Sequence, residues 1–95
     1  MTSTEKAVEA CRFVVRGRVQ GVFFRAETQA RAESLEVAGS VQNRPDGSVE
    51  AVFEGEPERV DSLVEWCRRG PAGAEVESVD VSAEEPTGER NFVVS

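Results

Sequence analysis

Apolar residues alternate with mostly charged ones over residues 11–16, where Cys11, Phe13 and Val15 would share one side. This period of two predicts a strand with one face on a core. A glycine-rich stretch follows at 17–22, and apolar or small residues then recur at steps of three or four from Phe24 to Leu35. That spacing predicts an amphipathic helix, which the glycine-rich loop joins to the strand.

The rest of the chain predicts a hairpin, a second helix and two more strands. Residues 40–44 and 49–54 flank Pro45-Asp46-Gly47, which is turn material, so they predict a β-hairpin. Apolar residues at i, i+3, i+4 and i+7 from Val60 predict a helix that Gly70-Pro71 ends. Strands are also predicted at 76–81, where the broken alternation indicates a bulge, and at 92–94, as a short edge strand.

The predicted order is strand, helix, strand, strand, helix, strand, with a final short edge strand. The first six elements make the split β-α-β, or ferredoxin-like, arrangement. In this α+β fold both helices pack on one face of an antiparallel sheet. At 95 residues the chain is too short for two ordinary domains. We therefore expect residues 9–95 to form a single domain, preceded by a flexible N-terminal segment at residues 1–8.

The net charge of the chain limits the classes of molecule that we expect it to bind. The chain has 18 acidic and 11 basic residues, a net charge of −7, so its average field disfavours nucleic acids and anionic membranes as partners. The sequence has no stretch typical of a signal peptide or a membrane span, which predicts a cytoplasmic protein, and its size and charge favour a monomer. The acidic excess also raises the hypothesis of adaptation to a salty cytoplasm.

The cysteine and histidine content limits the kinds of disulfide, metal site and catalysis that the chain can have. Cys11 and Cys67 fall at apolar positions of predicted elements, so we expect two reduced core thiols and no disulfide. The chain has no histidine, no Cys/His metal-ligand cluster, no nucleotide-binding P-loop and no serine in a triad setting. The sequence therefore predicts neither a metal nor a cofactor, and it excludes histidine acid–base catalysis.

The loop before the first helix is the strongest candidate for chemistry. Glycines let successive N–H groups turn toward one point, and the helix N-terminus adds unsatisfied donors and a positive dipole end, which suits a phosphate. Arg25 would lie in the first helical turn, where a cation is unfavourable by roughly 0.3–1 kcal/mol. Bidentate binding of phosphate oxygens by the guanidinium would explain an arginine at this position. From the residues alone, Arg18 and Arg25 can equally be solvated surface residues. Asn43 lies just before the predicted hairpin turn, and a role in folding that turn stays open for it.

Three segments taken together resemble the acylphosphatase family. They are Val15–Arg25 with its GRVQGVFFR core, Gly39–Gly47 and Gly70–Val76, and the resemblance runs in order from about Arg12 to Val94. Members cleave the carboxyl–phosphate anhydride of acyl phosphates to a carboxylate and inorganic phosphate, on a ferredoxin-like fold without a cofactor. The resemblance therefore implies a small acyl phosphate as substrate.

The same resemblance implies roles for individual residues. Arg25 matches the family's phosphate-binding arginine, and Asn43 matches the asparagine that orients the attacking water. The implied phosphate-binding loop and its arginine are Arg18, Val19, Gln20, Gly21, Val22, Phe23, Phe24 and Arg25. Two departures concern loop shape and substrate preference: Phe23 stands where many members carry glycine or another small residue, and Glu36-Val37 replaces a common Gly-Leu.

Two other interpretations belong to different functional classes. Acylphosphatase-like domains also occur inside larger hydrogenase-maturation proteins, and ferredoxin-like folds bind many ligands, so a non-catalytic phosphate- or ligand-binding module is one alternative. The chain carries no zinc finger or accessory domain, which favours a free-standing enzyme. An RNA-recognition domain would show a basic, aromatic sheet surface, and the acidic balance and lack of tyrosine argue against it.

Overall fold

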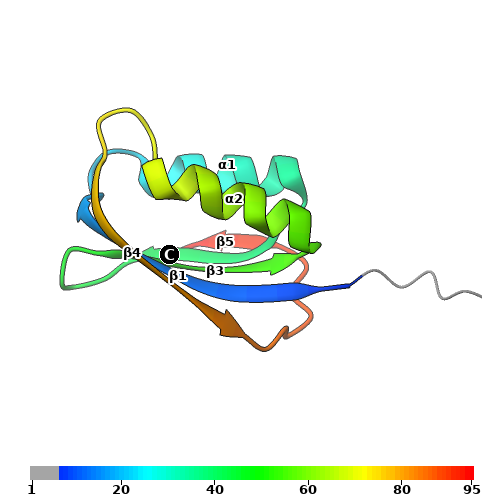
Figure 1. Cartoon of the computed structure of the whole chain (residues 1–95). Helices are drawn as coiled ribbons and strands as arrows, with labels where there is room; N and C mark the ends of the chain where they lie inside the picture. The colour runs from blue at the N-terminus through cyan, green and yellow to red at the C-terminus, as the bar shows by residue number, and fades with distance from the viewer. Residues whose placement is uncertain (1–6) are drawn as a thin grey trace, which may run out of the picture.

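The computed structural model describes residues 7–95 (Figure 1). The predicted elements are all present, in the predicted order. They are β1 (Glu9–Arg18), α1 (Phe24–Leu35), β2 (Ala38–Asn43), β3 (Val49–Gly55), α2 (Pro57–Arg69), β4 (Glu75–Glu84) and β5 (Phe92–Val94). Most of the N-terminal segment predicted to be flexible, residues 1–6, lies outside the described part of the chain.

The strands form one five-stranded sheet in the order β4-β1-β3-β2-β5, and both helices cover the same face of it (Figure 1). This confirms the predicted α+β, ferredoxin-like fold. The first four strands pair in antiparallel fashion, whereas β5 pairs with β2 in parallel, so the complete sheet is mixed. The parallel pair arises because the chain reverses direction after β4, which is itself antiparallel to β1 and so opposite in direction to β2.

Strand direction determines what meets at each end of the sheet. Both β1 and β2 are antiparallel to β3, and β5 is parallel to β2, so β1, β2 and β5 all run in one direction. Their carboxyl ends therefore meet at one end of the sheet. Since α1 follows β1 after a short loop, α1 begins at this same end.

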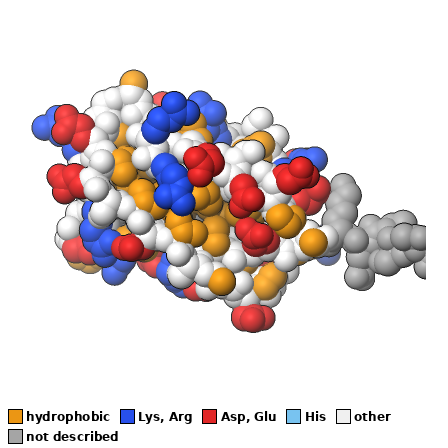
Figure 2. Space-filling view, viewed as in Figure 1, with side chains coloured by type: hydrophobic (Ala, Val, Ile, Leu, Met, Phe, Trp, Pro, Cys, Tyr) orange, Lys and Arg blue, Asp and Glu red, His pale blue; other side chains and the backbone are white. Residues whose placement is uncertain are grey.

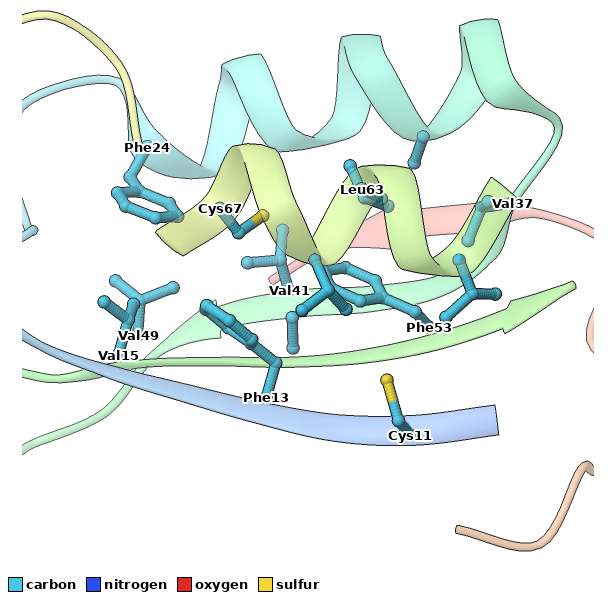
Figure 3. Packing of buried hydrophobic residues seen from close by; sticks show 14 of the residues in the cluster. Cys11, Phe13, Val15, Phe24, Val37, Val41, Val49, Phe53, Leu63 and Cys67 are labelled. Carbon is cyan, nitrogen blue, oxygen red and sulfur yellow. The ribbon is translucent and has the colours of Figure 1, made fainter. Parts of the chain in front are cut away.

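The core lies between the sheet and the two helices (Figure 3). The predicted inward face of β1 is buried, and it meets the apolar faces of α1 and α2 there. Cys11 and Cys67 are both buried and free. Burial raises the pKa of the Cys11 thiol to about 11 and that of the Cys67 thiol to about 12, so both sulfurs stay protonated at neutral pH and behave as core residues.

The predicted irregularity in the fourth strand is a bulge beside Gly17. Arg16 lies opposite Ser78 and Gly17 lies opposite Val76, so Glu77 is the extra residue on β4. A Cβ on Gly17 would lie 2.1 Å from the carbonyl oxygen of Glu75. Only glycine lets the two strands approach this closely, and the same bulge explains the broken alternation over 76–81.

The face of the sheet away from the helices carries a charged network across four strands. Arg12 of β1 pairs with Glu50 of β3 and, at 3.2 Å, with Glu84 of β4. Gln42 of β2 donates to Glu50 at 3.1 Å. Acidic and basic side chains are also interspersed over the face seen in Figure 2.

Neither helix within residues 7–95 combines the length and the apolar character needed to cross a membrane.

Candidate functional site

A cavity of about 380 Å³ opens at the end of the sheet where β1, β2 and β5 finish. Its lining residues are Val19, Gly21, Phe23, Phe24, Arg25, Ala26, Gln29, Asn43 and Val94. Arg25 comes from α1 and Asn43 from the last position of β2. The common direction of β1 and β2 therefore brings the two predicted catalytic residues to one cavity.

The loop from β1 to α1 turns sharply at its two left-handed residues. Gly21 has φ 76° and Phe23 has φ 65°. A Cβ added to Gly21 would meet nothing within 4 Å, so the position requires glycine for its backbone conformation and not for lack of space. Val19, 1% exposed, anchors the loop in the core.

Helix α1 begins at the cavity without a side-chain cap. Phe23 is the N-cap residue, and no side chain of residues 7–95 makes a capping hydrogen bond there. The first bond of the helix runs from the Glu27 N–H to the Phe23 carbonyl at 3.0 Å, so the N–H groups of Phe24, Arg25 and Ala26 precede the helical ladder. With the positive end of the helix dipole, these donors suit an anion.

The guanidinium of Arg25 is held by the chain after β5. Its Nη1 donates to the main-chain oxygen of Ser95 at 2.5 Å, and the Ser95 N–H donates to the Val41 carbonyl at 3.0 Å. The guanidinium has five N–H donors, and Ser95 is its only hydrogen-bond partner within residues 7–95. Most of the planar donor fork is therefore available to a ligand.

The side-chain amide of Asn43 has no hydrogen-bond partner among the described residues, and the residue is half-buried. The turn after β2 is held instead by Asp46, whose Oδ1 accepts from the Ser48 N–H at 2.9 Å and from Ser48 Oγ at 2.6 Å. These hydrogen bonds lower the pKa of the Asp46 carboxyl. Because Asp46 supplies the turn contact, the turn-forming interpretation of Asn43 has no support in the geometry.

Gln20 ties the loop to the β2–β3 hairpin. Its Nε2 donates to the carbonyl oxygens of Arg44 and Ser48, each at 2.9 Å. Since Asn43 directly precedes Arg44, these two bonds fix the loop relative to the Asn43 side chain. Gln20 thus acts as a bridge beside the cavity rather than as part of its lining.

Three predicted phosphate-binding residues lie outside the lining of the cavity. Besides Gln20, Arg18 is exposed at the end of β1, where it lies opposite Glu75, and the Val22 side chain packs against the core. The other predicted site residues line the cavity: Val19, Gly21, Phe23, Phe24, Arg25 and Asn43.

Three lining residues, Ala26, Gln29 and Val94, were not predicted. Gln29 lies four residues after Arg25, so it shares a helix face with it, and its Nε2 donates to the Phe92 carbonyl at 3.5 Å. That spacing was the signal available in the sequence. Val94 arrives through the parallel pairing of β5 with β2, which no local pattern indicates.

Among residues 7–95, Arg25 is the one charged residue in the lining, so the cavity is locally positive on a chain of net charge −7. No aspartate or glutamate of the described chain lines the cavity. Among residues 7–95, no group of His, Cys, Asp or Glu side chains is arranged to hold a metal ion. The arrangement can bind a small anion and orient a neutral polar molecule beside it.

Comparisons with known proteins point to one family. The family model for acylphosphatase matches residues 11–94. An acylphosphatase of Rubrobacter xylanophilus is 60% identical over 85 residues, which make up 87% of this chain and 76% of that protein. The solved structure of an acylphosphatase from Coxiella burnetii has a TM-score of 0.91 at 35% identity and covers 98% of this chain and 100% of its own. HypF of T. kodakarensis has a TM-score of 0.80 at 28% identity, over 92% of this chain but 12% of its own.

Proposed function

The chain belongs to the acylphosphatase family, and from that premise we propose that it hydrolyses the carboxyl–phosphate bond of acyl phosphates in the cavity at the start of α1. By homology it is an acylphosphatase enzyme. The products are a carboxylate and inorganic phosphate. The observation that carries the proposal is the convergence of three features on one small cavity. They are the Arg25 guanidinium, a helix N-terminus without a side-chain cap and an Asn43 amide without a hydrogen-bond partner, both within residues 7–95.

The phosphate of the substrate binds where the positive groups converge. The free N–H groups of the Arg25 guanidinium bind two phosphate oxygens side by side, and main-chain N–H groups of the loop before α1 and of its first turn surround the rest. In phosphoryl transfer the charge is spread over the equatorial oxygens of the transition state, so catalysis depends on positioning and on fixed positive groups. Arg25 and the loop amides supply both.

Asn43 orients the attacking water. Its amide accepts a hydrogen bond from the water and holds it in line with the phosphorus–oxygen bond that breaks. The water oxygen bonds to phosphorus, and the acyl oxygen leaves with the bonding electron pair as a carboxylate. An amide cannot take the proton of the water, and no carboxylate from the described residues lines the cavity, so a phosphate oxygen of the substrate accepts this proton.

Benzoyl phosphate hydrolysis in the presence of a chelator tests this function. We expect turnover by the wild type and losses of at least about 100-fold with Arg25→Ala and Asn43→Ala, comparable to removal of one oxyanion donor. Arg90→Ala and Asn91→Ala are matched controls, because both residues are exposed and lie outside the cavity, and they should keep wild-type rates. Circular dichroism checks that each variant is folded.

Two outcomes would contradict parts of the proposal. A folded wild type that binds inorganic phosphate but releases none from benzoyl phosphate would indicate a non-catalytic binding module. A pH–rate profile with the pKa of an enzyme base would exclude proton transfer to the substrate. RNA recognition has little support, because the central strands present Arg12, Val14 and Glu50, and no aromatic ring, on the open face of the sheet within residues 7–95.

We also propose that residues 9–95 act as a single domain and that the protein works as a monomer in the cytoplasm. The helices and strands of residues 9–94 share one sheet and one core, which supports the single domain. The long edge strand β4 carries Glu75, Glu77 and Asp80, and like charges on an edge oppose pairing with a second copy. Light scattering at two protein concentrations checks the mass in solution.

A further inference from the structure

Phe23 differs from every other phenylalanine in the described chain. Each of the other four lies within about 6.1 Å of another aromatic ring, measured between ring centroids, and is at most 7% exposed. They are Phe13, Phe24, Phe53 and Phe92. Phe23 is 78% exposed and has no ring partner among residues 7–95. Its ring face is therefore free to contact a ligand.

The backbone at Phe23 is strained in the same place. Its φ of 65° and ψ of 21° lie in the left-handed region, where a side chain with a Cβ is unfavourable. The other non-glycine residue with positive φ in the described chain is Glu36, which ends α1 and lines no part of this cavity. Folding stability alone would favour glycine at position 23, so an exposed aromatic residue held there calls for a functional explanation.

The lining of the cavity contains two kinds of surface. Arg25, Gln29 and Asn43 supply its polar groups, whereas Phe23 and Val94 are exposed apolar side chains at its surface. An acyl phosphate has the same two parts, a charged phosphate and an acyl group. A cavity of about 380 Å³ lies at the small end of the usual range for ligand sites, which suits a phosphate that carries a single acyl group.

We propose that the Phe23 ring, together with Val94, binds the acyl group of the substrate and selects acyl phosphates with an aromatic or other bulky apolar acyl group over acetyl phosphate. This inference rests on the proposed function and names its substrate class. A planar aromatic acyl group gains contact with the ring by stacking, whereas an acetyl group is too small to cover it. Because the acyl contact is the same before and during phosphoryl transfer, it lowers KM without changing kcat.

The test compares benzoyl phosphate with acetyl phosphate on the wild type, Phe23→Ala and Phe23→Leu. We expect Phe23→Ala to raise KM for benzoyl phosphate about tenfold with kcat unchanged, and to change KM for acetyl phosphate less than twofold. Phe23→Leu keeps an apolar side chain without a ring, so its KM for benzoyl phosphate should lie between those of the wild type and Phe23→Ala. Val81→Ala is the matched control, since Val81 is an exposed apolar residue outside the cavity, and inhibition by inorganic phosphate should stay the same in every variant.

The outcomes separate this inference from the function on which it rests. A folded wild type that hydrolyses neither substrate contradicts the proposed function. With an active wild type, equal rises in KM for both substrates, or weaker inhibition by inorganic phosphate in Phe23→Ala, would show that Phe23 acts through loop shape and would overturn the inference. Unchanged kinetics on both substrates would overturn it as well.

Discussion

In the described chain, two non-glycine residues have a left-handed backbone conformation, and their surroundings differ. Glu36 ends α1, and its carboxylate pairs with Arg59 Nη1 at 2.6 Å, which also donates to the Leu35 carbonyl at 3.1 Å. Phe23 has no such compensation, since its side chain is 78% exposed. The strain at Glu36 therefore belongs to a helix end, while the strain at Phe23 lies at the surface of the cavity.

We predict that Phe23→Gly makes the fold more stable. Left-handed backbone costs a non-glycine residue about 1–2 kcal/mol, and replacing Phe23 by glycine removes this cost. Glycine loses more conformational entropy on folding, which offsets about 0.5–1 kcal/mol of the gain. Little burial is lost with an exposed ring, so the free energy of unfolding should rise by about 0.5–1 kcal/mol. Thermal unfolding measures it, as an increase of a few degrees in Tm for a chain of this size.

Glu36→Gly is the matched control for that prediction. It relieves the same backbone strain but removes an exposed ion pair with Arg59, which contributes at most about 1 kcal/mol. Its gain in stability should therefore be smaller, and its hydrolysis of benzoyl phosphate should equal that of the wild type. A lower Tm for Phe23→Gly would mean that the ring contributes to packing and would contradict the prediction.

Elements come together at the cavity through strand direction and through one side-chain bridge. The bridge is Gln20, whose two hydrogen bonds of 2.9 Å join the loop before α1 to the hairpin after β2. Arg25 follows the loop and Asn43 precedes the hairpin turn. Gln20 is therefore a positioning residue, which sets the distance between the groups proposed to bind phosphate and to orient water.

We predict that Gln20→Ala lowers kcat about tenfold on benzoyl and acetyl phosphate alike and leaves KM within about twofold. A misplaced water affects the transition state and not substrate binding, so the loss appears in kcat. Gln42→Ala is the matched control, because Gln42 bonds to Glu50 on the opposite face of the sheet and should leave kcat unchanged. A loss of Tm in Gln20→Ala without a change in kcat would instead assign Gln20 a purely structural role.

Local periodicity predicted the elements because each buries one side only. The alternation at Cys11, Phe13 and Val15 and the i, i+3, i+4 spacing in α2 reflect a single core between sheet and helices. The parallel place of β5 was not predicted, because it follows from long-range pairing with β2. Arg25 was a candidate from its place in the first turn of the predicted helix, but its role and that of Asn43 came from the family resemblance. The strand at 92–94 was predicted, whereas the place of Val94 at the cavity was missed because it depends on the pairing of β5 with β2.

At the scale of the whole molecule, negative charge is concentrated at one edge of the sheet. Residues 75–89 include six acidic residues and no basic one: Glu75, Glu77, Asp80, Glu84, Glu85 and Glu89. Arg16 and Arg12 pair with Asp80 and Glu84, and the other four have no cationic partner within residues 7–95. Self-repulsion at β4 and the loop after it therefore opposes folding at low salt.

We predict that Tm rises by several degrees when NaCl increases from about 0.1 M to 1 M, as the screening length falls from about 10 Å to 3 Å. Salt also weakens the surface ion pairs, but these are partly exposed and each contributes at most about 1 kcal/mol. The double variant Glu77→Gln, Glu85→Gln removes two unpaired charges, so it should raise Tm at low salt and reduce the salt dependence. If Tm stays flat or falls with salt in the wild type, the attractive pairs outweigh the repulsion, and the acidic edge is not a salt-dependent feature of stability. If Tm of the double variant rises with salt as much as that of the wild type, the effect of salt does not arise from these charges at the edge of the sheet.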